Sequence, residues 1–120
     1  KASIQVIPGP SSITAAISAC PFEINSFFYE GFLPQKTNER IKAIGRLKNV
    51  KVPIILLDTP YRRGPLLETL EEILTPKQRA LLALDISGPD ENYLYGTLKE
   101  LRSQTKALGK LNFVLILEPS

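Results

Sequence analysis

The segment 6–12, with the sequence V-I-P-G-P-S-S, constrains the fold of this chain more than any other stretch. It joins an apolar run over 4–7 to a small-residue stretch over 13–19. Pro8 and Pro10 fix φ near about −65°, and Gly9 between them can adopt φ values closed to other residues. Ser11 or Ser12 is expected to cap the following helix with its hydroxyl. The segment therefore predicts a tight corner between a strand and a helix.

A corner of this kind has two interpretations. Its free amide groups and the positive end of the helix dipole favour a polar or anionic ligand. The alternative is a well-capped helix start that binds nothing. The residues of the corner alone do not separate the two.

The rest of the chain alternates short apolar runs with amphipathic segments. We expect strands at 3–7, 26–30, 52–57, 79–86 and 113–117, with a short edge strand at 93–95. We expect helices at 11–19, 37–47, around 65–74 and after Thr97. At 120 residues and with this alternation, the sequence predicts a single α/β domain, a mixed sheet of about five strands with flanking helices.

Particular side chains are expected to define the helix ends and faces. Thr37 is expected to cap the helix over 37–47, which would bury Ile41, Ile44 and Leu47. The sequence Thr97-Leu98-Lys99-Glu100 is a capping box, with Thr97 at the cap position and Glu100 as its reciprocal hydrogen-bonding partner. Its helix is expected to turn three leucines inward, namely Leu98, Leu101 and Leu108.

The aromatic run 27–29 raises the question of base stacking. Successive strand residues point to opposite faces, so we expect packing in the core instead, and the residues 31–34 are expected to end this strand. Cys20, near a helix end, is expected to be a small buried apolar side chain.

The composition excludes several kinds of site. The chain has no histidine and one cysteine, which removes the commonest general base and the commonest zinc ligands. We therefore expect no metal site and no Cys–His or Ser–His nucleophile. A single cysteine also favours a reducing cytoplasm, and no apolar run approaches the ~20 residues that span a bilayer. The net charge of +3 permits an anionic partner. Because the chain begins at Lys1 in strand-like sequence, it is expected to be a piece of a longer protein.

Three motifs occur in a recognisable order: V-I-P-G-P-S-S at 6–12, F-F-Y-E-G-F-L-P at 27–34 and L-L-D-T-P-Y-R at 56–62. Together they resemble the C-terminal half of the tetrapyrrole-methylase-type (class III) S-adenosylmethionine-dependent methyltransferases. The nearest branch by these motifs is the one that 2′-O-methylates a cytidine ribose in small-subunit ribosomal RNA. The resemblance extends over essentially the whole chain.

The resemblance implies a cytoplasmic, homodimeric enzyme of two domains with S-adenosylmethionine in the cleft between them. This chain, 1–120, would be the C-terminal methyltransferase domain, with 1–10 as the interdomain strand and turn. The N-terminal domain, which carries the glycine-rich cofactor loop, would be a separate partner absent from this chain. The positions that the resemblance assigns to the cofactor cleft are Pro8, Gly9, Ser11, Ser12, Leu57, Asp58, Ile86, Ser87 and Asn112.

The chain departs from the pattern of the ribosomal branch at polar positions. That branch commonly has F-Y-E followed after two residues by H-R, where this chain has Leu57, Asp58 and Tyr61 before Arg62. The R-E-L-T-K stretch corresponds to 84–88, and a late G-E pair to 111–112. Two alternatives therefore stay open: a tetrapyrrole (corrin or porphyrin) methyltransferase, and a non-catalytic RNA-binding or dimerisation module that kept the fold.

Methyl transfer to a ribose hydroxyl depends on alignment of donor and acceptor and on a group that polarises the hydroxyl. The first candidates for this catalytic role are Glu30 and Asp58, followed by Asp85 and Tyr61. Glu30 stands at a strand end, where its alternative is a solvated carboxylate. Asp58 precedes Thr59-Pro60, so its alternative is a turn-capping side chain.

Basic residues supply the candidates for contact with ribosomal RNA. Lys36, Arg40 and Arg46 belong to the polar face of the helix over 37–47 or its approach, and Arg62 and Arg63 could bind phosphate oxygens. The alternative is that these cations are simply the solvated side of their helices.

Overall fold

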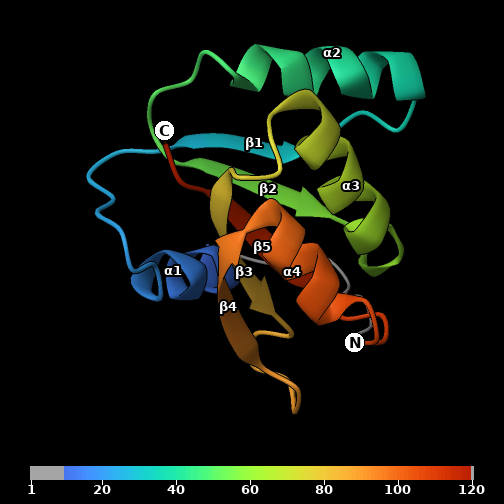
Figure 1. Cartoon of the computed structure of the whole chain (residues 1–120). Coiled ribbons are helices and arrows are strands. Elements are labelled where there is room, and N and C mark those ends of the chain that lie inside the picture. Colours follow the sequence, from blue (N-terminus) through green and yellow to red (C-terminus); the bar gives the residue numbers. More distant parts are fainter. Residues whose placement is uncertain (1–9, 120) are drawn as a thin grey trace.

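The computed structural model describes residues 10–119 and confirms the predicted single α/β domain with a mixed sheet (Figure 1). Its elements follow one another as α1 (Pro10–Ser18), β1 (Phe28–Phe32), α2 (Thr37–Leu47), β2 (Ile54–Asp58), the 3₁₀ turn η2 (Pro60–Arg62), α3 (Arg63–Ile73), β3 (Arg79–Leu84), β4 (Asn92–Thr97), α4 (Leu98–Thr105) and β5 (Phe113–Leu117). The strand predicted at 3–7 lies outside the described residues, as do Pro8 and Gly9.

The five strands lie in the order β1-β2-β5-β3-β4. β1 is parallel to β2, while β5 lies between β2 and β3 and is antiparallel to both. β4 closes the other edge, antiparallel to β3. The carboxyl ends of β1, β2 and β3 therefore lie on the same side of the sheet, where the strands end and β5 starts. This edge carries the candidate site described below.

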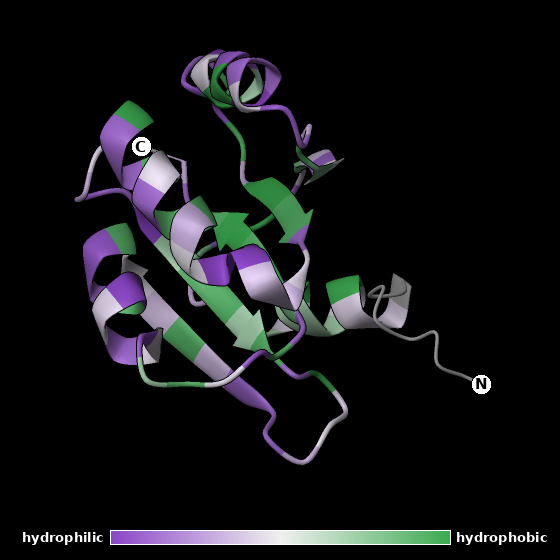
Figure 2. Ribbon diagram, turned by 90° about the vertical axis from the view of Figure 1, so that its right-hand side faces the viewer, coloured by the Kyte–Doolittle hydropathy of each residue, from purple (hydrophilic) through white to green (hydrophobic). Residues whose placement is uncertain are grey.

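The strand residues alternate between two apolar layers because successive side chains point to opposite faces. One set, which includes Ile54, Leu56 and Leu82, packs under α2, α3 and α4. The other set, which includes Ile55 and Val114, packs against α1. Figure 2 shows mostly apolar strands in the middle of the molecule and many hydrophilic residues on the helices that cover one face of the sheet. β2 and β5 are buried along their full length, as the continuous apolar runs predict.

The predicted elements agree with the structure within a few residues, and the capping box is confirmed. The Thr97 hydroxyl accepts from the Glu100 amide at 3.1 Å, and the Glu100 carboxylate accepts from the Thr97 amide at 2.9 Å. The edge strand predicted at 93–95 is real and longer, running from Asn92 to Thr97.

Two expectations about helix caps are wrong, and the expected buried face of α2 holds for Ile44 and Leu47 only. α1 begins at Pro10, so Ser11 and Ser12 lie in its first turn and not at its cap. Thr37 is already helical: the cap position is Lys36, which makes no side-chain capping bond. The buried stripe of α2 is narrow and centred on Ala43, Ile44 and Leu47.

Two side chains predicted to be buried are exposed. Ile41 is 45% exposed, because it lies outside the narrow stripe by which α2 contacts the sheet. Leu108 is 41% exposed, because α4 ends at Thr105 and the chain leaves the helix before this residue.

β1 differs most from its prediction. Gly31 does not end the strand: it lies inside it, at a bulge with a φ of 71° that glycine adopts readily. The aromatic residues 27–29 are 42–50% exposed, so the expected packing in the core is wrong. The reason is their place at the sheet edge, since α1 packs against β5 and β3 and does not extend over β1. Cys20 is half-buried beside α1, partly as predicted.

Candidate functional site

A hollow of about 470 Å³ opens at the sheet edge where β1, β2 and β3 end. Each strand contributes to it through the residues at or just beyond its carboxyl end, and the segment before β5 closes it. In α/β sheets, ligands bind at this kind of position, outside the carboxyl ends of parallel strands. The lining residues are Phe32, Thr59, Pro60, Tyr61, Asp85, Lys110, Leu111 and Asn112.

Asn112 is the polar centre of this hollow. Its backbone carbonyl accepts from the Asp85 amide at 2.8 Å, which ties the start of β5 to the end of β3. Its side-chain oxygen Oδ1 is buried and has no hydrogen-bond partner. A buried acceptor without a donor costs about 1–3 kcal/mol. Because Asn112 lines the hollow, a rotation of its side chain would bring this acceptor to a ligand that carries an N–H or O–H group.

Asp85 follows β3 in a strained turn. It has a φ of 45°, and Ser87 has a φ of 70°, both in the left-handed region that costs about 1–2 kcal/mol for residues other than glycine. The Asp85 carboxylate accepts from the Asp90 amide at 2.9 Å. A Cβ on Gly88 would lie 2.3 Å from that carboxylate, so any other residue there would displace the Asp85 side chain. Strain held by such a turn is common where a side chain must face a ligand.

A second carboxylate closes the same turn. Glu91 accepts from the Tyr93 hydroxyl at 2.6 Å and from the Ser87 amide at 3.1 Å. These two donors, the tyrosine first, lower the pKa of Glu91, and the same bond raises the pKa of Tyr93. Glu91 therefore stays ionised at neutral pH and holds the turn that carries Asp85.

Asp58 ends β2 and is only 4% exposed. Its Oδ2 accepts from Arg40 Nη2 at 2.7 Å, and its Oδ1 accepts from the Thr59 amide at 2.7 Å. Arg62 Nη1 is 3.9 Å from Oδ1. Both oxygens are thus engaged, so Asp58 joins α2 to the end of β2 and sets the path of the chain into the hollow.

Only some of the residues predicted to bind the cofactor or to act in catalysis line the hollow. Asn112 lines the hollow together with Asp85 and Tyr61. Leu57 and Asp58 immediately precede Thr59, which lines the hollow, and Leu57 is buried on the α1 side of the sheet. The other described candidates do not line it: these are Glu30, half-buried in β1; Ser11 and Ser12 on α1; Ile86, packed against the α1 layer; and Ser87, exposed in the turn after β3.

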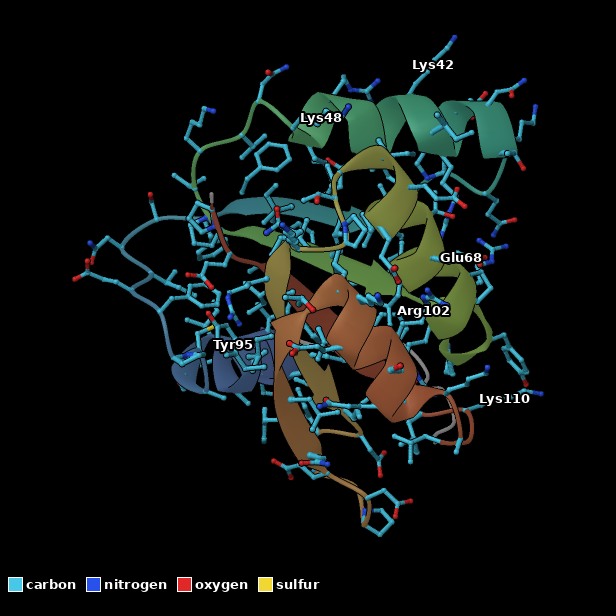
Figure 3. The ribbon with its side chains drawn as sticks, viewed as in Figure 1. Lys42, Lys48, Glu68, Tyr95, Arg102 and Lys110 are labelled. Carbon is cyan, nitrogen blue, oxygen red and sulfur yellow. The ribbon has the colours of Figure 1, made fainter. Side chains whose placement is uncertain are left out.

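Some of the predicted RNA-binding residues are exposed, and others are held in contacts within the protein. Lys36, Arg46 and Lys48 are exposed, and Lys42 extends outward from α2 (Figure 3). The Arg40 guanidinium is instead held between Asp58 and the Pro34 carbonyl, which it reaches at 3.4 Å.

Arg62 and Arg63 differ from each other although they are adjacent. Arg62 is half-buried beside Asp58. Arg63 is buried at the start of α3, where its guanidinium donates to backbone carbonyls. Contact of these cations with RNA stays a prediction.

Sequence reasoning missed Lys110, Phe32 and Thr59 as lining residues. Lys110 Nζ lies 4.5 Å from the centroid of the Tyr61 ring, a cation–π contact that places a positive charge at the hollow. A signal for these residues exists only once the strand directions are known, because each stands next to the end or start of a strand at the same edge.

Residues 10–119 contain neither a cluster of metal-ligating side chains nor a membrane-spanning helix. No cluster of three or more cysteine, aspartate or glutamate side chains there could hold a metal ion. No helix in this part of the chain is long and apolar enough to cross a membrane.

Comparison with known proteins gives consistent matches. The family model for "Tetrapyrrole (Corrin/Porphyrin) Methylases" matches residues 1–102. The protein named ribosomal RNA small subunit methyltransferase I from Neisseria meningitidis serogroup B is 33% identical over 125 residues, covering 100% of this chain and 43% of the relative. The protein of the same name from Thermotoga maritima is 30% identical, covering 93% of this chain and 51% of the relative. The chain thus spans about half the length of these relatives.

Solved structures of low identity share the fold. A cobalt precorrin-4 methyltransferase superposes with a TM-score of 0.64 at 16% identity, over 92% of this chain and 50% of that one. A uroporphyrin-III C-methyltransferase from Thermus thermophilus, solved in complex with S-adenosylhomocysteine, superposes with a TM-score of 0.52 at 16% identity, over 79% of this chain and 42% of that one. At these identities the likeness establishes the architecture alone.

Proposed function

Because this chain belongs to the family of tetrapyrrole (corrin/porphyrin) methylases, we propose that it is the C-terminal domain of an S-adenosylmethionine-dependent methyltransferase. The proposed acceptor is a ribose 2′-hydroxyl of small-subunit ribosomal RNA. The names of the relatives at 30–33% identity support an RNA acceptor. The neighbour solved with S-adenosylhomocysteine supports the cofactor. The whole protein would be a cytoplasmic homodimer in which an N-terminal domain carries the rest of the cofactor site.

The buried oxygen of Asn112 is the observation in the structure that carries this proposal. The hollow around it is formed by strand ends, and Asn112 Oδ1 lacks a donor there. S-adenosylmethionine carries an α-ammonium group, ribose hydroxyls and an adenine amino group, any of which donates a hydrogen bond. The residues present therefore fit the cofactor, with Asn112 as the side chain that would contact it.

S-adenosylmethionine supplies an electrophilic methyl group, and the chain's own residues must orient the acceptor. Asp85 and Tyr61 are the candidates that line the hollow. The Asp85 carboxylate would accept a hydrogen bond from the acceptor hydroxyl and take up its proton, and the Tyr61 hydroxyl would orient the acceptor by a hydrogen bond. Asp58, with both oxygens engaged, is assigned a positioning role through Thr59. Glu30 remains a candidate only if the acceptor extends along β1.

The cofactor assignment is tested by titrating the full-length protein with S-adenosylmethionine in a calorimeter. We expect Asn112→Ala to raise the dissociation constant about tenfold, which corresponds to about 1.4 kcal/mol. The matched control is Asn49→Ala, an exposed asparagine beyond the end of α2. Unchanged affinity in Asn112→Ala would remove the cofactor from this hollow.

The acceptor is tested in the same preparation by transfer of labelled methyl groups. Small-subunit ribosomal RNA, protein-free, is compared with a tetrapyrrole such as uroporphyrinogen. Label in RNA supports the proposal, and label in the tetrapyrrole alone transfers the function to the other branch of the family. A folded protein that binds no cofactor and methylates neither would be a non-catalytic module.

A further inference from the structure

Arg63, the first residue of α3, is a buried cation without a carboxylate partner. Its side chain is part of a residue only 6% exposed. Its Nη2 donates to the carbonyls of Thr105, Leu108 and Gly109 at 3.2, 3.4 and 3.1 Å. Its Nη1 is buried and has no partner. Among the described residues, the ion pairs involve Arg40, Arg62 and Arg102 but not Arg63.

This arrangement leaves positive charge uncompensated. Burial lowers the pKa of Arg63, yet a guanidinium stays protonated in proteins. Neutral carbonyls at the end of α4 stabilise one edge of the group through the helix dipole. They provide neither a full negative charge nor a partner for Nη1. An anion is the chemical species that would supply both.

Arg63 lines a second hollow, of about 470 Å³, between the start of α3 and the end of α4. We call it the basic hollow, and its charged lining residues are Arg63, Arg102, Lys106, Lys110 and the carboxylate of Glu68. Arg102 is already paired with Glu71, which leaves Arg63 and the two lysines against Glu68. Gly64, in the first turn of α3, is exposed and also lines this hollow. Figure 3 shows Arg102, Glu68 and Lys110 on this side of the molecule.

The basic hollow adjoins the candidate cofactor site. The two hollows share Pro60, Tyr61 and Lys110. In RNA, the carbon that carries the 2′-hydroxyl is bonded to the carbon that carries the 3′-phosphate. An acceptor hydroxyl held beside Tyr61 therefore has a phosphate within a few bonds, on the side where the basic hollow opens.

We propose that the basic hollow is a phosphate subsite, which binds the RNA backbone next to the ribose that receives the methyl group. The proposal rests on the function proposed above and adds the residues that would hold the acceptor. Lys106 and Lys110 contact the phosphate at the mouth. Arg63 supplies buried charge at the base, and a small rotation about its side chain gives Nη1 an oxygen partner. This subsite is separate from the exposed cations of α2.

The test measures binding of a fluorescently labelled single-stranded RNA pentanucleotide to the full chain by anisotropy, without cofactor, at several salt concentrations. Arg63 itself is unsuited, because its substitution also removes three bonds to the α4 end. The test variant is Lys106→Gln/Lys110→Gln, both exposed. The matched control is Lys77→Gln/Lys99→Gln, two exposed lysines at the other end of α4 with the same loss of charge. A third variant, Lys36→Gln/Arg46→Gln, removes cations of α2.

We expect the test variant to weaken RNA binding about tenfold and to flatten the dependence of log Kd on log salt by about 0.7 for each lost phosphate contact. The Kd of the control variant should change by less than about threefold, because its two lysines would contribute only nonspecific attraction. Equal weakening by all three variants, or an effect confined to the α2 variant, would overturn the proposal. Such a result would assign the attraction to diffuse charge or to α2.

Inorganic phosphate distinguishes an RNA backbone from a free anion. We expect millimolar phosphate to shift the backbone amide resonance of Gly64 and to displace the pentanucleotide. A shift at Gly64 without displacement would mean that the hollow binds a small anion only, and it would overturn the RNA assignment. The binding assay contains no cofactor and is independent of methyl transfer. A protein that binds RNA through the basic hollow but transfers no methyl group would refute the proposed function and not the phosphate subsite.

Discussion

The contact between Asp58 and Arg40 allows a quantitative prediction about the end of β2. Asp58→Ala removes a charge-assisted hydrogen bond from Arg40 Nη2 at 2.7 Å, worth about 1.5–3 kcal/mol, and a bond from the Thr59 amide at 2.7 Å, worth about 1 kcal/mol. It also leaves Arg40, whose side chain is 11% exposed, without its counterion. The more distant Arg62 adds little, because its side chain is 35% exposed. We expect a loss of about 3–4 kcal/mol, in the range for a broken buried ion pair.

The measurement is urea unfolding of the full chain followed by circular dichroism, as a double-mutant cycle of Asp58→Ala, Arg40→Met and both together. We expect a coupling energy of about 2 kcal/mol, because the double variant no longer carries an unpaired buried charge. Asp58→Asn keeps an acceptor for the Thr59 amide and should lose about 1 kcal/mol less than Asp58→Ala. A coupling energy below about 0.5 kcal/mol would refute the positioning role and would leave Asp58 available for catalysis.

Three further predictions concern stability and reactivity. Thr97→Ala should lower the free energy of unfolding by about 1 kcal/mol through loss of the capping box, while Ser103→Ala on the exposed side of the same helix should change it little, both by urea unfolding. Leu56→Ala, fully buried in β2, should cost about 3–5 kcal/mol, and Leu108→Ala less than about 1 kcal/mol; equal costs would contradict the burial described here. Burial, with a smaller effect of the Glu118 charge, raises the pKa of Cys20 to about 11. Its alkylation by iodoacetamide should therefore be slow at pH 8 and rise steeply up to about pH 11, and a plateau near pH 9 would refute the shift.

The order of elements was predictable because each depends on local patterning. Continuous apolar runs at 52–57 and 113–117 predicted strands buried on both faces, and both strands occur in the middle of the sheet. The capping box at Thr97 satisfies its own helix end without help from elsewhere. Such features carry their physical cause within a few residues.

Features that depend on neighbours distant in sequence were not predictable. The exposure of Phe27 and Phe28 follows from the place of β1 at the sheet edge, which only the strand order reveals. The pairing of Asp58 with Arg40, 18 residues earlier, turned two candidates for function into a contact between α2 and β2. The alternation of apolar and polar residues does not indicate which polar side chains will pair in the folded protein.

The order of the strands also explains why the candidate site lies where it does. With β5 inserted antiparallel between β2 and β3, the segment that precedes β5 returns to the edge where β1, β2 and β3 end. Asn112 thus stands between Thr59 and Asp85, although each comes from a different loop. The same segment, 105–110, accepts the Arg63 guanidinium and brings Lys110 onto Tyr61. One connection therefore forms a wall of both hollows. A change that displaces it, such as shortening the chain at Gly109, is expected to weaken cofactor and RNA binding together, whereas changes at Asn112 or Lys106 should separate them.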